Sequence, residues 1–203
     1  MAYTDYTKKH DDKKVEDDKH DGKKGHADNK HDDKKDDDHG KDYDHGHGHS
    51  KIIYGTKKDD LLEGTKHDDV IKGDKGDDHI YGKGGDDKLY GEQGKDDLYG
   101  GKGNDWLSGD KGADDLYGGK GDDKLWGGDG KDTFHFDKHD NGYDTVFDFD
   151  VKKDSLDFGG AKDIDYKDDG KGNTIASWDG GTVKLIGVDS DHFDHGHGDY
   201  WMS

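Results

Sequence analysis

Large apolar residues recur every nine residues between positions 55 and 135, with glycines and polar residues between them. Nine consecutive units begin with glycine, carry aspartate at position six and a large apolar residue at position eight, and contain no insertion or deletion. The position-eight residues are Leu62, Ile71, Ile80, Leu89, Leu98, Leu107, Leu116, Leu125 and Phe134. Positions seven to nine alternate outward, inward and outward, which predicts a short strand with one buried side chain. Residues 51–54 fit the strand half of a further unit, with Ile53 at position eight.

The rest of each unit predicts a turn. Glycine at position one, and at position four in seven of the nine units, permits positive φ angles and close backbone approach. Two units then make one coil of 18 residues with two strands and two turns. Successive coils stack at the strand spacing of roughly 4.8 Å. The repeat therefore predicts a stack of coils with a buried apolar file.

Coiling brings aspartates that are distant in sequence side by side. One edge carries a first aspartate row, and the opposite edge carries a second. The first row is Asp60, Asp78, Asp96, Asp114 and Asp132, and the second row is Asp69, Asp87, Asp105 and Asp123. Carboxylates held this close repel each other unless a cation lies between them. Calcium is the expected cation, because it accepts six to eight oxygen ligands in a flexible arrangement, whereas magnesium requires a stricter octahedron.

This pattern resembles the calcium-binding nonapeptide repeat of the RTX (repeats-in-toxin) family, which implies an all-β, right-handed parallel β-roll. In that family each ion lies between a turn and the turn two units later, bound by both position-six aspartates and by carbonyl oxygens near positions one to four. The resemblance implies the pairs Asp78 with Asp96, Asp96 with Asp114, Asp114 with Asp132, Asp87 with Asp105, and Asp105 with Asp123. The implied glycine ligands are Gly73, Gly76, Gly82, Gly85, Gly91, Gly94, Gly100, Gly103, Gly109, Gly112, Gly118, Gly121, Gly127 and Gly130.

The first two units depart from the family pattern, because Lys58 and His67 occupy position four. We therefore expect five regular calcium sites and up to two further sites that use Asp60 and Asp69. The nine inward apolar side chains are few for the 81 residues of the repeats. The roll is accordingly predicted to be largely unfolded without metal and to fold as calcium binds.

Composition narrows the classes of partner. The chain has 52 acidic and 32 basic side chains, a net charge of −20 and only 25% hydrophobic residues, which argues against nucleic acid and anionic membranes. It lacks an apolar run long enough for a transmembrane helix, and its N-terminus lacks the apolar segment of a cleaved signal peptide. Such a composition also occurs in disordered low-complexity chains. The fixed positions in nine consecutive units favour the repeat structure.

The flanking segments differ from the repeats, and we divide the chain at 1–50, 51–135 and 136–203. Residues 1–50 hold 15 acidic residues, 11 lysines and eight histidines, which predicts a disordered arm. His45, His47 and His49 at its end can bind Zn²⁺ or Ni²⁺ through neutral imidazoles. The alternative is a solvated tail with incidental histidines.

Residues 136–203 are predicted to form a small β cap, because they contain more apolar residues and two strand-like segments at 173–178 and 182–188. Their order resembles the C-terminal cap of serralysin-type secreted proteases and related type I secreted proteins. That resemblance implies an uncleaved C-terminal export signal and a type I secretion apparatus as partner. The implied location is outside the cell or at its surface.

The sequence lacks the motifs of common enzymes, including H-E-x-x-H, G-x-S-x-G and the P-loop. The first hypothesis is therefore a non-enzymatic calcium-binding protein that folds in extracellular calcium after type I secretion. A second is a polysaccharide-binding module similar to the R-modules of alginate epimerases, which would use a ladder of Tyr81, Tyr99 and Tyr117. The alternative role for these tyrosines is cross-strand packing. A third hypothesis is an enzyme with an unrecognised site.

Overall fold

The computed structural model describes residues 50–138 and 142–193, which all lie in the unit Asp37–Ser203. The predicted disordered arm lies outside the described residues except for Ser50, as does the C-terminal segment 194–203. The strands are β1 (Ile52–Tyr54), β2 (Leu61–Glu63), β3 (Val70–Lys72), β4 (His79–Tyr81), β5 (Lys88–Gln93), β6 (Asp97–Lys102), β7 (Trp106–Gly112), β8 (Asp115–Lys120), β9 (Lys124–Gly130), β10 (Thr133–His135), β11 (Tyr143–Val146), β12 (Ser155–Asp157), β13 (Asp165–Asp168), β14 (Thr174–Trp178) and β15 (Gly181–Leu185). A single-turn 3-10 helix, Ser190–His192, follows them.

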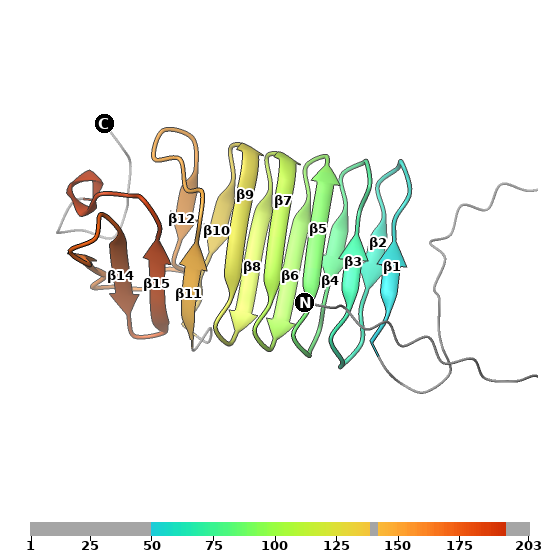
Figure 1. Cartoon of the computed structure of the whole chain (residues 1–203), viewed down its shortest axis with the longest axis horizontal. Coiled ribbons are helices and arrows are strands. Elements are labelled where there is room, and N and C mark those ends of the chain that lie inside the picture. The colour runs from blue at the N-terminus through green and yellow to red at the C-terminus, as the bar shows by residue number, and fades with distance from the viewer. Residues whose placement is uncertain (1–49, 139–141, 194–203) are drawn as a thin grey trace, which may run out of the picture. The chain divides into compact units, whose positions relative to one another are not determined.

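The strands form two facing sheets between which the chain alternates (Figure 1). The nine-stranded sheet has the order β1-β3-β5-β7-β9-β11-β15-β14-β13, and the six-stranded sheet has the order β12-β10-β8-β6-β4-β2. Within the repeats all pairs are parallel with a register of 18 residues, as Ile53 opposite Ile71 and Ile80 opposite Leu98 show. The predicted all-β parallel roll is confirmed.

The core of the roll is a single file of position-eight side chains between the two sheets. Ile53 and Leu62 at the first coil are 4% and 7% exposed, and the position-eight residues from Ile71 to Phe134 are 0% exposed. Their neighbours at positions seven and nine point outward, as the period-two pattern predicts. The strands of the middle units are longer than predicted, because β5 to β9 continue through position one into the turn.

Parallel pairing continues beyond the last repeat unit. Strand β11 pairs with β9, and β12 pairs with β10, so residues 143–157 add one more coil to the stack. Strand β15 then pairs with β11 in parallel. Strands β14 and β15 overlap the two segments predicted as strand-like and form an antiparallel hairpin. Aromatic side chains fill this end, where Phe149 and Tyr166 both pack against Phe193.

Glycine serves two different purposes in the turns. At position four, Gly76, Gly85, Gly94, Gly103, Gly112 and Gly121 have positive φ, as predicted. The position-one glycines do not, but a side chain at any of them would collide with neighbouring oxygen atoms. Position two also has positive φ from the third unit onward, including at Lys83 (80°) and Glu92 (71°). The sequence analysis did not predict this, because lysine and glutamate carry no such signal.

Candidate metal centre

The two aspartate rows form as predicted, and a ladder of hydrogen bonds orders each of them. The backbone N–H of each aspartate donates to Oδ1 of the aspartate in the next coil, over 2.7 to 3.0 Å. In the first row, for example, Asp78 N–H donates to Asp96 Oδ1, and Asp96 N–H donates to Asp114 Oδ1. Each carboxylate from Asp69 onward is thereby held inside the turn with one oxygen satisfied by the protein.

The second oxygen of most of these carboxylates is buried and has no hydrogen-bond partner in the described chain. This holds for Oδ2 of Asp78, Asp87, Asp96, Asp105, Asp114 and Asp132. The same residues are at most 1% exposed. A buried carboxylate oxygen without a partner is strongly unfavourable unless a proton or a cation binds it. The arrangement therefore calls for a positive ligand at each of these atoms.

The position-one glycines create the space next to these oxygens. A Cβ added to Gly100 would lie less than 3.0 Å from both Asp105 Oδ2 and the carbonyl oxygen of Gly118 in the next coil. Gly82 is similar, with Asp87 Oδ2 and the Gly100 carbonyl in the corresponding places. A carboxylate oxygen and a main-chain carbonyl oxygen thus converge on the face of both glycines. Hard oxygen atoms of these two kinds are the ligands that calcium prefers.

Burial strongly raises the pKa of carboxyl groups in both aspartate rows. It raises the pKa of Asp105 from 3.8 to about 8, and the neighbouring carboxylates of Asp123 and Asp87 add to the rise. Burial likewise raises the pKa of Asp78, Asp87 and Asp114 to about 7. The pKa of Asp96 and of Asp132 rises to about 6, again chiefly through burial. Without a cation, the rows are therefore partly protonated near neutral pH.

The first two units have a different turn. The N–H of Thr56 donates to Asp60 Oδ2 over 2.6 Å, and the N–H of Thr65 donates to Asp69 Oδ2 over 2.5 Å. The threonine hydroxyls accept the position-four N–H groups of Lys58 and His67. We call this arrangement the closed turn, and we call the turns of units three to nine open turns. In a closed turn the second carboxylate oxygen is already satisfied by the protein.

Two further aspartates, outside the nine repeat units, continue the rows. Asp144 Oδ1 accepts the N–H of Asp123 and thereby extends the second row. Asp154 Oδ1 accepts the N–H of Asp132 and extends the first row. Their spacings of 21 and 22 residues break the nine-residue period, so the repeat pattern does not reveal them. Asp154 lies in a closed turn, because its Oδ2 accepts the N–H of Asp150.

The donor set fits calcium rather than a metal held by side chains alone. Among residues 50–138 and 142–193, there is no group of three or more His, Cys, Asp or Glu side chains arranged to hold a metal ion. The open turns instead combine carboxylate oxygens with main-chain carbonyls. His45, His47 and His49, the predicted zinc or nickel ligands, lie outside the described residues.

Comparison with known proteins agrees with this geometry. Residues 52–80, 73–107 and 108–138 match the family model of the RTX calcium-binding nonapeptide repeat. Residues 52–138 are thus RTX calcium-binding nonapeptide repeats. The RTX resemblance noted in the sequence is thus confirmed, and RTX repeats are calcium-binding repeats. A comparison with curated protein sequences found no match.

Two solved structures are similar to the chain. The extracellular lipase LipA from Serratia marcescens is 18% identical, with 71% of this chain and 39% of the lipase chain covered and a TM-score of 0.32. The AlgE6R3 subunit of the mannuronan C5-epimerase from Azotobacter vinelandii is 25% identical, with 73% of this chain and 90% of that chain covered and a TM-score of 0.30. The chain described here thus spans less than half of the length of the lipase.

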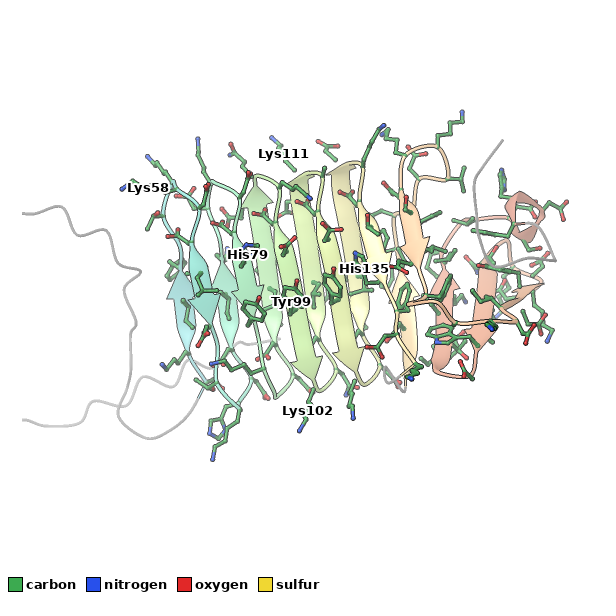
Figure 2. All side chains as sticks on the ribbon, turned by 180° about the vertical axis from the view of Figure 1, so that it is seen from behind. Lys58, His79, Tyr99, Lys102, Lys111 and His135 are labelled. Carbon is green, nitrogen blue, oxygen red and sulfur yellow. The ribbon has the colours of Figure 1, made fainter. Side chains whose placement is uncertain are left out.

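The outer face of the six-stranded sheet carries the predicted tyrosine ladder (Figure 2). The rings of Tyr81 and Tyr99 stack at a centroid distance of 4.6 Å, those of Tyr99 and Tyr117 at 4.5 Å, and His135 extends the stack at 4.1 Å. Both ring nitrogens of His135 lie about 3 Å from carboxylate oxygens, Asp115 on β8 and Asp157 on β12. Because the rings cover each other's faces, the ladder packs the sheet of the RTX roll.

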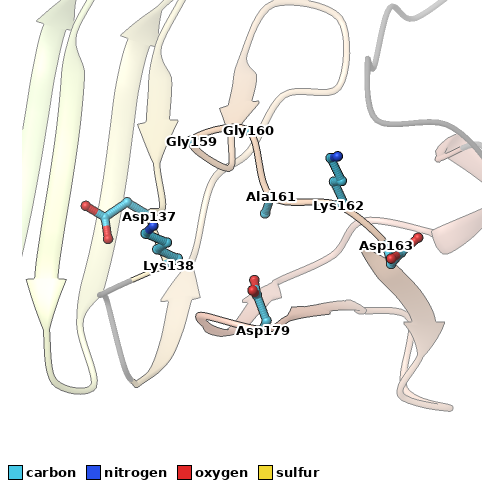
Figure 3. A pocket seen from close by; sticks show the side chains of 8 residues that line it. All are labelled: Asp137, Lys138, Gly159, Gly160, Ala161, Lys162, Asp163 and Asp179. Atoms are coloured by element: carbon cyan, nitrogen blue, oxygen red, sulfur yellow. The ribbon is translucent and has the colours of Figure 1, made fainter.

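An open pocket of about 690 Å³ lies where the RTX roll meets the C-terminal strands (Figure 3). Asp137 and Lys138 follow β10, and Asp179 lies in the turn of the β14–β15 hairpin. The segment 159–163 forms the remaining wall. The pocket wall includes carboxylates and lysines together. The described residues also contain no helix that is long and apolar enough to span a membrane.

Proposed function

We propose that this chain is a non-enzymatic calcium-binding RTX protein that folds when it meets extracellular calcium after type I secretion. The observation that carries the proposal is the set of buried Oδ2 atoms that lack a hydrogen-bond partner in the open turns. Each atom needs a positive ligand, and the carbonyl oxygens beside them suit calcium. Calcium would neutralise the rows and complete the turns, without taking part in a reaction.

The geometry favours five sites within the repeats. Each would join a free Oδ2 atom in one open turn to the carbonyl groups of the open turn in the next coil. The sites pair Asp78 with Asp96, Asp96 with Asp114, Asp114 with Asp132, Asp87 with Asp105, and Asp105 with Asp123. Asp60 and Asp69 already receive a backbone N–H at Oδ2, so we do not assign further sites to them.

Coupling of folding to calcium follows from the energetics of the apo rows. Without calcium, folding would bury closely spaced carboxylates beside a single file of apolar side chains. A ligand that binds only the folded state shifts this balance in proportion to the logarithm of its concentration. Sites of extracellular modules have dissociation constants of roughly 10⁻⁴ to 10⁻³ M. Such affinities would leave the chain unfolded in the cytosol and folded outside, as passage through a narrow export channel requires.

Far-ultraviolet circular dichroism of the full chain against free calcium tests the proposal. We expect a weak β signal in excess chelator and a cooperative gain of β signal as calcium enters the millimolar range. Magnesium at the same concentration serves as the control and should have little effect, because it requires a stricter geometry. A β signal that is the same in chelator and in calcium would contradict the proposal.

The alternative, polysaccharide binding, receives less support from the geometry. Aromatic side chains that bind sugars must leave a ring face open, but the faces of Tyr99 are covered by Tyr81 and Tyr117. A hollow of about 320 Å³ beside Tyr99, Tyr117 and His135 remains as a place for a ligand. Glycan-array binding that is lost in Tyr99→Ala, with the calcium response intact, would favour this alternative.

A further inference from the structure

Asp132 has a free oxygen that the five repeat sites do not use. In those sites, the free Oδ2 atoms of Asp78 and Asp114 each converge with a carbonyl oxygen of the next open turn of the first row. Asp132 lies in the last unit, so the turn that follows it is 147–154, between β11 and β12. Its Oδ2 is nevertheless buried and has no hydrogen-bond partner. This oxygen therefore needs a positive ligand outside the five pairs.

The turn 147–154 places a carboxylate on the same glycine that borders this oxygen. Asp148 takes the place that glycine occupies at position one, because Phe147 bonds to Leu125 and follows β11 along β9. Its Oδ1 accepts the N–H of Gly127 over 3.0 Å, and its Oδ2 accepts the N–H of Gly128 over 2.9 Å. A Cβ added to the same Gly127 would lie 2.5 Å from Asp132 Oδ2. Two carboxylates thus meet at one glycine.

Other charged groups of this turn have partners of their own. Lys153 forms an ion pair with Asp150 over 3.2 Å. Both oxygens of Asp154 accept backbone N–H groups, from Asp132 and from Asp150. Each oxygen of Asp148 accepts only one N–H and keeps lone pairs for a further contact. The junction therefore combines a buried free oxygen with an adjacent carboxylate that can still bind a cation.

We propose that Asp132 and Asp148 bind a sixth calcium ion, between the last repeat unit and the turn 147–154. This inference rests on the proposed calcium binding by the repeats. The ion links the β9–β10 turn to the β11–β12 turn, and it thereby makes the strands that follow the repeats part of the calcium-dependent fold. Asp148 is the distinctive ligand, because the five repeat sites have glycine at the corresponding place.

Native mass spectrometry of the full chain in saturating calcium tests the sixth site by counting ions. Asp96 serves two repeat pairs, so Asp96→Asn should lose two ions. Asp132 serves one repeat pair and the junction, so Asp132→Asn should also lose two. Loss of only one ion from Asp132→Asn, alongside two from Asp96→Asn, would overturn the sixth site alone. An unchanged count in Asp96→Asn would instead overturn the proposed repeat sites.

A second comparison of ion counts uses two variants that leave the buried aspartates unchanged. Asp148→Asn should lose one ion, whereas Asp150→Asn, a matched loss of one charge in the same turn, should lose none. Both changes lie outside the buried rows, so folding of the repeats should persist in each variant. Equal ion counts in Asp148→Asn and the unmodified chain would overturn the sixth site.

Discussion

The first two repeat units and six of the seven that follow share the same aspartate but differ in the state of its second oxygen. In units one and two, Oδ2 of Asp60 and Asp69 accepts a backbone N–H from the threonine at position two. From unit three onward, position two has positive φ, and the buried Oδ2 of Asp78, for example, has no hydrogen-bond partner. A position-six aspartate is therefore not sufficient for a site. The conformation at positions two and four decides whether its carboxylate is satisfied or free.

The same closed turn recurs at the other end of the first row. The N–H of Asp150 donates to Asp154 Oδ2, and Asp150 Oδ1 accepts the N–H of Lys152, as threonine does in the first two units. Open turns that need a cation thus lie between closed turns that do not. This arrangement lets the row begin and end without leaving a buried oxygen unsatisfied at the closed turns.

The largest expected effect is the pH dependence of calcium-free stability, which follows from protonation of the aspartates in the open turns. The folded-state pKa of Asp105 is about 8 and that of Asp78 about 7, both raised from 3.8 chiefly by burial. The folded state then binds more protons than the unfolded state between about pH 4 and pH 8, so calcium-free stability falls as pH rises through this window. We expect chelated protein to show more β signal at pH 5 than at pH 8. A calcium-free β signal that increases with pH would contradict this reasoning.

Calcium binding should depend on pH in the opposite sense. Because calcium and protons compete for the same carboxylates, the affinity for calcium should increase as pH rises through the same window. Calcium titrations at pH 5.5 and pH 7.5 measure this difference. Equal affinity at the two pH values would mean that the buried carboxylates are not the ligands.

A matched pair of aspartates in the second row compares open and closed turns directly. Asp105 serves two proposed sites, so Asp105→Asn should lose two ions and raise the calcium midpoint of folding by roughly tenfold or more, a change of about 1.4 kcal/mol. Asp69 lies in a closed turn, so Asp69→Asn should cost stability through its hydrogen bonds to Lys51 and Thr65 but leave the ion count unchanged. Isothermal titration calorimetry provides both numbers. Equal ion losses in the two variants would remove the distinction between the turns.

Two alanine substitutions compare a glycine whose face is crowded by oxygen atoms with a glycine that has open space around it. Gly100→Ala would place a methyl group against Asp105 Oδ2 and the Gly118 carbonyl, and should weaken calcium-dependent folding severely. Gly84 has no atom nearer than 3.8 Å to an added Cβ, so Gly84→Ala should be neutral or stabilise the fold by about 0.4–1 kcal/mol. Thermal unfolding in millimolar calcium compares them. Similar behaviour of both variants would show that the glycine face is not part of the site.

A smaller effect is expected from opening a closed turn. Thr65→Gly combined with His67→Gly removes the β-branched residue at position two and restores glycine at position four. The turn can then adopt the open conformation, and Asp69 should pair with Asp87 to bind one additional ion. The ion count in native mass spectrometry measures the gain, with Thr65→Ala as the control that keeps the original backbone preferences. No gain in the double variant would show that other features keep this turn closed.

The regular part of the molecule could be predicted from sequence because a fixed period determines which residues become neighbours. Position-eight residues such as Leu98 and the pairing of Asp78 with Asp96 follow from counting alone. Asp144 and Asp154 could not be found in this way, because they follow the preceding aspartate of their row by 21 and 22 residues instead of 18. The parallel pairing of β11 with β9 and of β12 with β10 shows that they continue the rows.

Side-chain stacking across the sheet faces was predictable only where one position repeats. The ladder of Tyr81, Tyr99 and Tyr117 uses position nine in alternate units, and it was predicted. The second stack was not, because Trp106 at position seven packs on Trp126 at position nine, at a centroid distance of 4.2 Å. This contact joins position seven of one unit to position nine of another, whereas the tyrosine ladder joins position nine to position nine. The closed turns were likewise foreseen only as departures from the pattern at Lys58 and His67, and the role of threonine at position two required the hydrogen bonds.

Crystallography of the full chain in millimolar calcium, with anomalous difference maps, tests the central claim most directly. We predict peaks about 2.3–2.6 Å from Oδ2 of Asp78, Asp87, Asp96, Asp105 and Asp114, the distance range of calcium–oxygen bonds. No peak is expected within that distance of Asp60 or Asp69 Oδ2. Open turns that contain no anomalous peak at saturating calcium, or peaks that favour the closed turns, would contradict the account.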